Sequence, residues 1–385
     1  MRAMLLAALL LGEGSVAGCS ARAPEPPRQA AAAPVPAPAP VPARAAAREP
    51  SVVPAGAPAP APNVRFLKGQ THVHTSGSYD AKAAPEAVLG YYAARGYDFV
   101  AITDHNRITV VTPPDGLLLV PGVELTQNAA SCAPAPPPGY RCLFHTSALF
   151  VDPARDRARG ALFTLPYHPE RVTAYAEQIA FATLLGGIAV INHPQFHFGA
   201  NADTIAELGR RGLRLLELSN AALDNQSPDG RDAAERRSER LWDDVLGRGL
   251  HVYALASDDA HHFPGDGVKR LEKARYSGDR GFVMVRAQKN LAAIRSALQN
   301  GDFYATTGVL LRELEALPSG VKIAVEPAAG VSYAIRFIGR GSRVLAEQQG
   351  AEASYAPRGD EGYVRAVVQA SGGQKAWIQP VFVGS

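Results

Sequence analysis

The chain has 385 residues, which suggests two domains, and its 46% hydrophobic and 19% charged residues exclude a wholly disordered or fibrous protein. The segment 20–63 carries four arginines and two glutamates, so most of the net charge of +3 lies there. Because the remainder is nearly neutral, we expect no binding to a nucleic-acid backbone.

The N-terminus is typical of a signal peptide over residues 1–18, with Arg2 before the apolar run Met4–Leu11. This run is too short for a membrane-spanning helix, so we expect an exported protein, periplasmic or at the cell surface. The end of this N-terminal segment, Val16-Ala17-Gly18-Cys19, resembles a bacterial lipobox, which implies a lipid anchor on Cys19 that binds the protein to a membrane. An ordinary secretory signal with a chance cysteine is the alternative, because Glu13 is unusual in such a segment.

A linker is expected at residues 19–63, which contain 13 prolines and 16 alanines. Such a composition has too little large apolar surface to offset the entropy of ordering, so the segment is predicted to be a disordered spacer. Farther along, Cys132 and Cys142 lie in a proline-rich loop. In an oxidising compartment we expect them to form a disulfide rather than a nucleophile or a metal site.

From Val64 onward, short apolar runs alternate with helical patterns, as in βα units around a parallel sheet. The expected strands are Phe66–Thr71, Phe99–Thr103, Leu117–Val120, Leu143–Val151, Ile188–Asn192, Leu213–Leu218 and His251–Ala256. The expected helices are Pro85–Arg95, Val172–Leu185, Asp203–Arg211 and Asp232–Arg248. The pattern predicts an α/β fold with an incomplete seven-stranded barrel.

The alternation of strands and helices ends after a further strand at Phe282–Val285 and a helix at Leu291–Gln299. Three short strands follow without a helical period, at Val321–Val325, Val331–Ile338 and Tyr363–Val368. We therefore expect a barrel over residues 64–305 and a small antiparallel, sandwich-like β domain over 306–385.

Polar side chains of the metal-binding type gather at or near the ends of the expected barrel strands. They are His72, His74, Asp104, His105, Glu124, His145, His193, Asp259 and His261. The carboxyl ends of barrel strands meet at one mouth, and a crowd of titratable groups there needs a compensating cation. A lone histidine after a strand is usually structural, but six of the ten in the chain belong to this set. The pattern therefore predicts a metal centre.

The pieces His72-Val73-His74, Ile102–His105, Pro121–Glu124, Asn192-His193-Pro194 and Asp259-Ala260-His261 resemble the PHP (polymerase and histidinol phosphatase) superfamily of metal-dependent phosphoesterases. The resemblance covers about 200 residues and implies a distorted seven-stranded (β/α)7 PHP barrel. The later stretches Phe303–Gly308, Tyr363–Ala366 and Ala376–Pro380 look like the CehA/McbA-type subgroup, which includes hydrolases of carbamate esters.

Carried over to this chain, the resemblance implies two or three divalent ions. His72, His74, Glu124 and Asp259 would hold the first ion, and Glu124 would bridge to a second ion held by His145 and His193. Asp80, His105 and His261 would hold a third. Asp258, beside Asp259, is a competing ligand. A mixture of imidazoles and carboxylates suits Zn, Mn or Fe.

Three residues are expected to act in catalysis: Glu124, Asp104 and Arg107. Asp104 is expected to be a hydrogen-bond partner of a ligand or, alternatively, a proton donor to the leaving group. Arg107 is expected to contact a phosphate, with a solvated surface arginine as the alternative.

The predicted function is hydrolysis of a phosphate mono- or diester, on a small-molecule ester substrate, by a hydroxide that bridges the ions near Glu124. No covalent nucleophile is expected, because the chain has neither a Gly-x-Ser-x-Gly elbow nor a Gly-Lys-Ser/Thr phosphate loop. Hydrolysis of a carboxyl or carbamate ester at the same centre is one alternative. A lipid-anchored binding protein without turnover is another.

Overall fold

The fold is described by a computed structural model over residues 64–384, except 158–159, 225–226, 228–229 and 266–277. The predicted signal peptide, Cys19 and the linker 19–63 lie outside the described residues. In the part of the chain that is described, no helix has the length and apolar character needed to cross a membrane.

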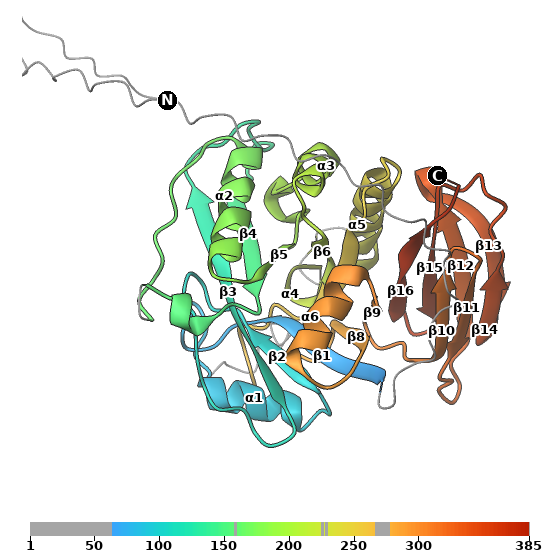
Figure 1. The fold of residues 1–385 in the computed structure, drawn as a ribbon, viewed down its shortest axis with the longest axis horizontal. Coiled ribbons are helices and arrows are strands. Elements are labelled where there is room, and N and C mark those ends of the chain that lie inside the picture. Colours follow the sequence, from blue (N-terminus) through green and yellow to red (C-terminus); the bar gives the residue numbers. More distant parts are fainter. Residues whose placement is uncertain (1–63, 158–159, 225–226, 228–229, 266–277, 385) are drawn as a thin grey trace, which may run out of the picture. The chain divides into compact units, whose positions relative to one another are not determined.

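Seven consecutive strands lie side by side in one sheet (Figure 1). They are β1 (Arg65–Val73), β2 (Phe99–Ile102), β3 (Leu118–Ala129), β4 (Cys142–Leu149), β5 (Ile188–Ile191), β6 (Leu215–Asn220) and β7 (Tyr253–Ser257). All seven of the predicted barrel strands are present. The four residues of β2 are all buried, as a strand covered on both faces requires.

The expectation of a parallel sheet is wrong at β4, which is antiparallel to both β3 and β5. The other neighbours among these strands are parallel. The reason is the connection: the loop 130–141 carries no helix, so β4 returns directly beside β3 as in a hairpin. The disulfide between Cys132 and Cys142 closes this loop.

The segment that follows β7 contacts the C-terminal end of β1. Val73 and Ala260 form a parallel bridge, the Asp259 amide donates to the His72 carbonyl at 3.0 Å, and the His74 amide donates to the Ala260 carbonyl at 3.0 Å. These contacts join β1 to the segment after β7, but no continuous ladder joins the two strands. A closed seven-stranded barrel is therefore not confirmed. The contacts still bring the ends of β1 and β7 together.

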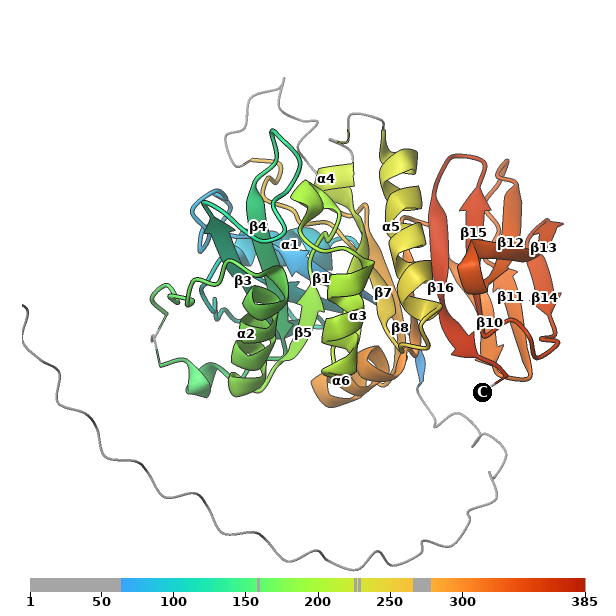
Figure 2. The ribbon, with the colours of Figure 1, turned by 90° about the horizontal axis from the view of Figure 1, so that it is seen from above.

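Helices cover the outside of the sheet. They are α1 (Pro85–Ala93), α2 (Arg171–Leu184), α3 (Ala202–Arg210), α4 (Ala221–Asp224), α5 (Arg231–Leu246) and α6 (Leu291–Asn300), with 3-10 turns at Pro153–Arg155, Phe196–Phe198 and Arg340–Ser342. Pro85 opens α1, and Asn201 and Asn290 cap α3 and α6 through their side-chain oxygens. In both ribbon views α2, α3 and α5 lie side by side (Figures 1 and 2).

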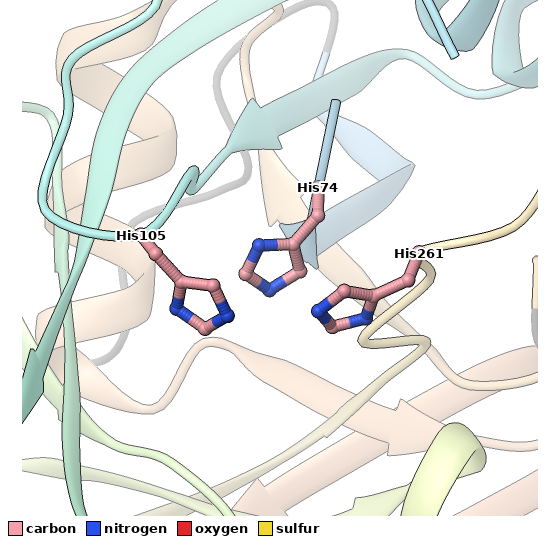
Figure 3. Close-up of side chains that lie close together, drawn as sticks. All are labelled: His74, His105 and His261. Carbon is pink, nitrogen blue, oxygen red and sulfur yellow. The ribbon is translucent and has the colours of Figure 1, made fainter. Parts of the chain in front are cut away.

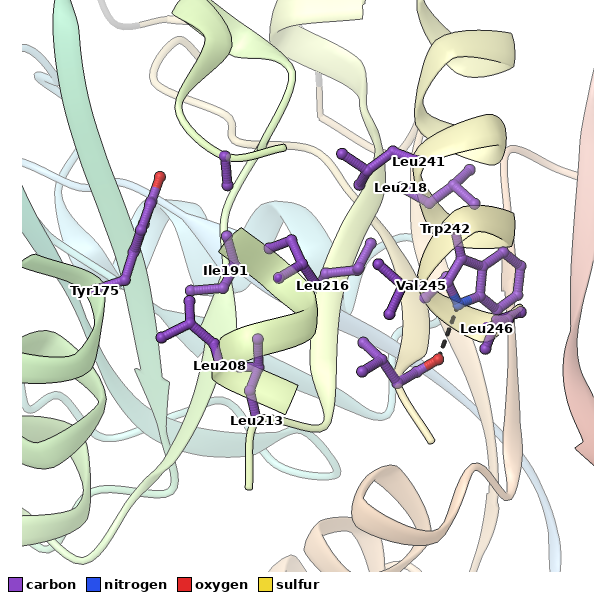
Figure 4. Close-up of a cluster of buried hydrophobic side chains, with 14 of the residues drawn as sticks. Tyr175, Ile191, Leu208, Leu213, Leu216, Leu218, Leu241, Trp242, Val245 and Leu246 are labelled. Atoms are coloured by element: carbon purple, nitrogen blue, oxygen red, sulfur yellow. Dashed lines mark hydrogen bonds between the residues drawn. The ribbon is translucent and has the colours of Figure 1, made fainter. Parts of the chain in front are cut away.

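Between α3, α5 and the strands lies a buried apolar cluster (Figure 4). Leu216 from β6 and Ile191 from β5 meet Leu208 from α3 and Trp242 from α5. The indole of Trp242 is fully buried, and its Nε1 donates to the Val252 carbonyl at 2.8 Å. This packing fixes the strand ends that carry the polar residues described below.

Six of the strands after β7 extend the same sheet beyond β1. They are β8 (Phe282–Ala287), β9 (Phe303–Thr306), β12 (Tyr333–Gly339), β13 (Arg343–Gln349), β15 (Tyr363–Ala370) and β16 (Lys375–Phe382). A second, antiparallel sheet consists of β10 (Leu311–Leu317), β11 (Gly320–Val325) and β14 (Glu352–Tyr355). The predicted boundary between residues 305 and 306 falls inside β9.

A buried ion pair joins α5 to the C-terminal strands. Asp243 accepts from Arg365 Nε at 2.6 Å and Nη2 at 2.8 Å, and also from the hydroxyls of Tyr363 and Ser342, each at 2.7 Å. The Arg365 side chain is 1% exposed and the Asp243 side chain 2%. With both charges out of water, this contact holds the C-terminal strands in one arrangement on α5.

Candidate metal centre

The predicted polar residues come together where the strands meet. Three groups of ligand atoms form, and within each group the atoms lie within 4.8 Å of one another. The groups are His72–His74–Asp259, His74–His105–His261 and Glu124–His145–His193. In the second group the three rings point toward one another (Figure 3). Eight of the nine predicted ligands are members of these groups, and the ninth, Asp80, lies beside the second.

The first group lies at the end of β1. His72 Nε2 and His74 Nε2 are 3.1 Å apart, and Asp259 Oδ1 is 3.3 Å from the first and 3.2 Å from the second. His72 and His74 point to the same side because alternate residues of a strand share a face. Three potential acceptors thus face one point in a buried region.

Glu217 orients His72. Its Oε1 lies 2.7 Å from His72 Nδ1 and accepts from the Ser257 hydroxyl at 2.6 Å. Burial raises the pKa of Glu217, but the adjacent His72 outweighs it and the net shift is downward, so the group is a carboxylate. A carboxylate only accepts, so a proton of His72 lies on Nδ1, and Nε2 is the atom that faces His74 and Asp259. Burial lowers the pKa of His72, but Asp259, Glu217 and Glu124 outweigh it and raise that pKa well above its ordinary value, so without a cation Nε2 also carries a proton and donates to His74.

Ser78 and Asp104 orient His74 in the same way. Ser78 Oγ donates to Asp104 Oδ1 at 3.0 Å, which uses its only hydrogen, and lies 2.9 Å from His74 Nδ1. His74 Nδ1 must therefore donate to Ser78, and His74 Nε2 presents a lone pair. Asp104 also accepts from the Thr75 amide and hydroxyl at 2.6 Å each, and from Thr109 Oγ1.

Glu124, in the middle of β3, belongs to the third group and lies close to the other two. Its Oε1 is 3.1 Å from His145 Nδ1 and 3.5 Å from His193 Nε2, while its Oε2 is 2.8 Å from His105 Nδ1 and 3.5 Å from His74 Nε2. Asn192 Nδ2 donates to Oε1 at 2.8 Å. Oε2 is buried and accepts no hydrogen bond from any described residue. A buried carboxylate oxygen without a donor, surrounded by imidazoles, fits a divalent cation.

Asp80 completes the third predicted set at the exposed edge. Its Oδ2 lies 3.4 Å from His105 Nε2 and 3.5 Å from His261 Nε2, and its side chain is 37% exposed. The exposed ring of Tyr79 stacks on His105 with centroids 5.0 Å apart. This side of the cluster is therefore open to an incoming molecule.

Neighbouring histidines of the cluster have pKa values shifted in opposite directions. Burial, with the neighbouring His261 and His105, lowers the pKa of His74 to about 3. Burial also lowers the pKa of His105, but Glu124 and Asp80 outweigh it and raise the pKa to about 10. Adjacent imidazoles held in opposite protonation states are the pattern expected where a cation is needed to neutralise several buried acids.

Asp258 and Asp259 have different surroundings. Asp258 accepts from the amides of Asp279, Arg280 and Gly281 and from the Tyr92 hydroxyl, all within 2.8 Å. Its hydrogen bonds join the end of β7 to the start of β8, and it belongs to none of the three groups. Of the two acids, Asp259 is the one placed in the cluster.

Arg107 lies in the turn after His105, where its amide donates to the Asp104 carbonyl at 3.4 Å. Its buried Nε has no hydrogen-bond partner among the described residues.

Glu217 and Ser78 were missed from the sequence. Glu217 had a readable signal, because an acid inside the buried run Leu215–Leu218 needs a polar partner. Ser78 gives no such signal, since a serine in a loop is common. Its role depends on the fold, which places it between His74 and Asp104.

A cleft of about 450 Å³ adjoins the cluster at His193. Its polar wall includes Glu217 and Asn220, and its apolar wall is formed by Tyr140, Phe196, Phe198, Leu218 and Leu223. Access to the cluster from this side passes over apolar side chains, as expected of a site for a small organic molecule.

No protein-family model matches this chain, and no curated protein matches it. Among solved structures it is similar to a two-domain protein from Bacteroides vulgatus ATCC 8482 that contains a predicted PHP-like metal-dependent phosphoesterase. The identity is 17% and the TM-score 0.43, over 80% of this chain and 91% of that chain. It is also similar to an amidohydrolase from Chromobacterium violaceum with bound sulfate and no metal, at 16% identity and a TM-score of 0.32, over 52% and 89%. Identities this low say nothing of chemistry, which has to be inferred from the side chains.

Proposed function

We propose that this protein is a metal-dependent hydrolase of the PHP type that cleaves a phosphate ester of a small molecule. The observation that carries the proposal is the meeting of His72 Nε2, His74 Nε2 and Asp259 Oδ1, three ligand atoms within 3.3 Å of one another. Glu217 and Ser78 hold the Nδ1 sides of the two rings, so both Nε2 atoms are directed at the same point. Two imidazole nitrogens and a carboxylate oxygen gathered in a buried region are a donor set for a divalent cation.

The proposed ligand sets are those implied by the resemblance, and each shares at least two members with one of the three groups. His72, His74, Glu124 and Asp259 would hold one divalent ion, Glu124, His145 and His193 a second, and Asp80, His105 and His261 a third. Bound divalent ions of this kind supply acidified water and charge neutralisation for phosphoryl transfer. Zn, Mn and Fe all suit such a donor set.

The chain's own residues supply orientation. Asn192 fixes Glu124, and Glu217 and Ser78 fix the two imidazoles of β1. Asp104 accepts from four donors, so we assign it a positioning role through Ser78 rather than proton donation to the leaving group. We also propose that Arg107 contacts the phosphoryl group of the substrate. If Arg107→Ala leaves kcat/KM for a phosphate ester unchanged, this contact is wrong.

The test is elemental analysis of the purified protein coupled to hydrolysis assays with and without chelator. The substrates are p-nitrophenyl phosphate, bis-p-nitrophenyl phosphate and a p-nitrophenyl carbamate. We expect bound divalent metal and chelator-sensitive release of p-nitrophenol from a phosphate. His74→Ala and Glu124→Ala should abolish turnover, while His168→Ala, outside the three groups, serves as the control.

Each outcome decides between candidates. Cleavage of the carbamate alone would replace the phosphoesterase by a carbamate ester hydrolase, the assignment that the CehA/McbA-like stretches favour. Metal binding without any turnover would favour a binding protein. A protein without metal, insensitive to chelator, would overturn the proposal.

We also propose that the protein is exported and held at a membrane by a lipid on Cys19. The support is the N-terminal sequence, with an apolar run before the cysteine and a linker after it. Cys19→Ser should move the protein from the membrane fraction to the soluble fraction. Unchanged partitioning would leave an ordinary secretory signal as the explanation.

A further inference from the structure

A second cavity of about 430 Å³ continues from the cleft beside His193. The two cavities share the lining residues Gln195, Phe198 and Arg237. The second one is lined by three arginines and one acid, which are Arg171, Arg237, Arg240 and Asp244. Its charge is therefore positive, unlike the metal cluster, whose walls are acidic.

Arg171 is a buried cation without a counter-ion. It is 5% exposed, and its guanidinium donates only to backbone carbonyls: Nε to Pro134 at 3.0 Å, and Nη1 to Phe198 and Gly199 at 2.8 and 3.0 Å. No described carboxylate lies within ion-pair distance of it. Burial lowers the pKa of Arg171, as expected for a cation whose charge is not compensated.

The free end of this guanidinium is available to a ligand. Nη2 forms no hydrogen bond with any described residue and, unlike Arg107 Nε, is not closed off from solvent. Arg240, exposed on α5, also has no partner among the described residues. Arg237 donates to Ser227 at 2.9 Å, so no part of the inference depends on it.

The start of α3 faces the same cavity. Asn201 and Ala202 line it, and the Asn201 side chain caps Thr204 rather than the first amides of the helix. Free amides at the first turn and the helix dipole favour an anion. Together with a guanidinium that has an unused edge, they form a site for a planar or tetrahedral oxyanion.

We propose that this cavity binds a second anionic group, a carboxylate or phosphate, of the substrate. The inference rests on the proposed function for the position of the scissile ester at the metal cluster. Because the apolar cleft connects the two sites, the substrate is an ester whose apolar body carries an acid at its far end. Free inorganic phosphate presents the same chemistry and is the competing source.

The experiment measures binding of phosphonates, which resist hydrolysis, to the metal-loaded protein by calorimetry. The probes are benzylphosphonate, 4-carboxybenzylphosphonate and its longer biphenyl counterpart, together with inorganic phosphate. We expect at least one carboxylated probe to bind roughly tenfold more tightly than the parent, the gain typical of a charge-assisted hydrogen bond. Arg240→Gln and Arg171→Gln should each reduce this ratio toward one.

Controls separate binding from folding. Arg236→Gln removes an equal charge from an exposed position of α5 outside the cavity and should leave the ratio unchanged. Arg171 also donates to the Phe198 carbonyl, so Arg171→Gln is expected to lower the melting temperature as well. Ala202→Pro tests the site independently, since proline at the first helical position removes one amide at little cost.

Equal binding of all the phosphonates would overturn the proposal. If inorganic phosphate then binds in an Arg240-dependent way, the cavity belongs to free phosphate instead. A carboxylate preference that persists in a protein without turnover would contradict the proposed function but not this site. Turnover without the preference would contradict this site alone.

Discussion

His72 Nε2 and His74 Nε2 face each other at 3.1 Å. Each ring directs its Nδ1 at a neighbour, Glu217 for His72 and Ser78 for His74, so both Nε2 atoms are aimed at one point. Asp259, Glu217 and Glu124 outweigh burial and raise the pKa of His72, so without a cation its Nε2 donates to His74, and a bound cation would displace that proton. The residues behind the imidazoles therefore matter for the site as much as the imidazoles themselves.

Glu217→Gln is expected to weaken metal binding while leaving the fold intact. Glutamine has the same size but can direct its amide hydrogens at His72 Nδ1, which would favour the wrong tautomer. Loss of such a partner typically lowers metal affinity about 10- to 100-fold. The measurement is retained metal after dialysis against a graded series of chelator concentrations. Glu207→Gln is the matched control, because Glu207 is a half-buried acid of α3 whose partners are Arg210 and Arg211, and it should retain metal like the wild type.

Asp104→Asn is expected to lower metal affinity without removing an ionisation from the pH profile of kcat. Its carboxylate accepts hydrogen bonds from Ser78 and Thr75. The NH2 group of an asparagine would face these donors and could not accept from them. Ser78→Ala should produce the same loss in part, because His74 Nδ1 then loses its acceptor. If Asp104→Asn instead removes the alkaline limb of the profile at full metal content, Asp104 donates a proton and the positioning role is wrong.

The ligands could be found from the sequence because the carboxyl ends of neighbouring parallel strands lie at the same edge of the sheet. Once a run such as Ile188–Asn192 is recognised as a buried strand, His193 after it is placed at the mouth by geometry alone. Asp258 and Asp259 could not be separated this way. Which acid faces the cluster depends on the amides of residues 279–281, which come from a segment about twenty residues away.

The direction of β4 and the course of the C-terminal strands were beyond the sequence. An apolar run predicts a strand but not its direction, and only the helix-free loop before Cys142 indicates the reversal. Similarly, the change of sequence pattern near residue 306 gives no sign that β16 pairs with β9 and continues the first sheet. Hydrogen bonds between distant strands leave no local pattern in the chain.

Arg365→Met should strongly destabilise the protein without changing its metal content. Removing the guanidinium leaves the buried Asp243 carboxylate without its charge partner, which typically costs about 3–5 kcal/mol. Urea unfolding monitored by Trp fluorescence measures the change. Arg343→Met breaks an exposed pair with Asp360 and is the control, expected to shift the midpoint little. Equal shifts for the two variants would mean that Asp243 is hydrated rather than buried.

Asp224, beside the apolar cleft, should make the stability fall as the pH rises. Burial, followed by the nearby Glu235, raises the pKa of Asp224 to about 7 from an ordinary value of 3.8. The folded protein therefore binds this proton more tightly than the unfolded chain does. Its contribution to stability is fully present below about pH 4 and is lost as the pH rises through about 7, at about 1.4 kcal/mol per unit of pKa difference.

Asp224→Asn should abolish this pH-dependent contribution to stability, because the side-chain amide cannot ionise. In the wild type the backbone amide of Asn220 donates to Asp224 at 2.9 Å, and the oxygen of the asparagine can still accept this hydrogen bond. The measurement is the free energy of unfolding of both proteins from pH 4 to pH 8 in the presence of chelator. The histidine cluster titrates in both proteins, so it cancels in their difference, and the variant should gain stability over the wild type as the pH rises. Asp115→Asn, at an exposed position, is the control. A difference that stays constant with pH would show that Asp224 is ionised throughout and that water reaches this wall of the cleft.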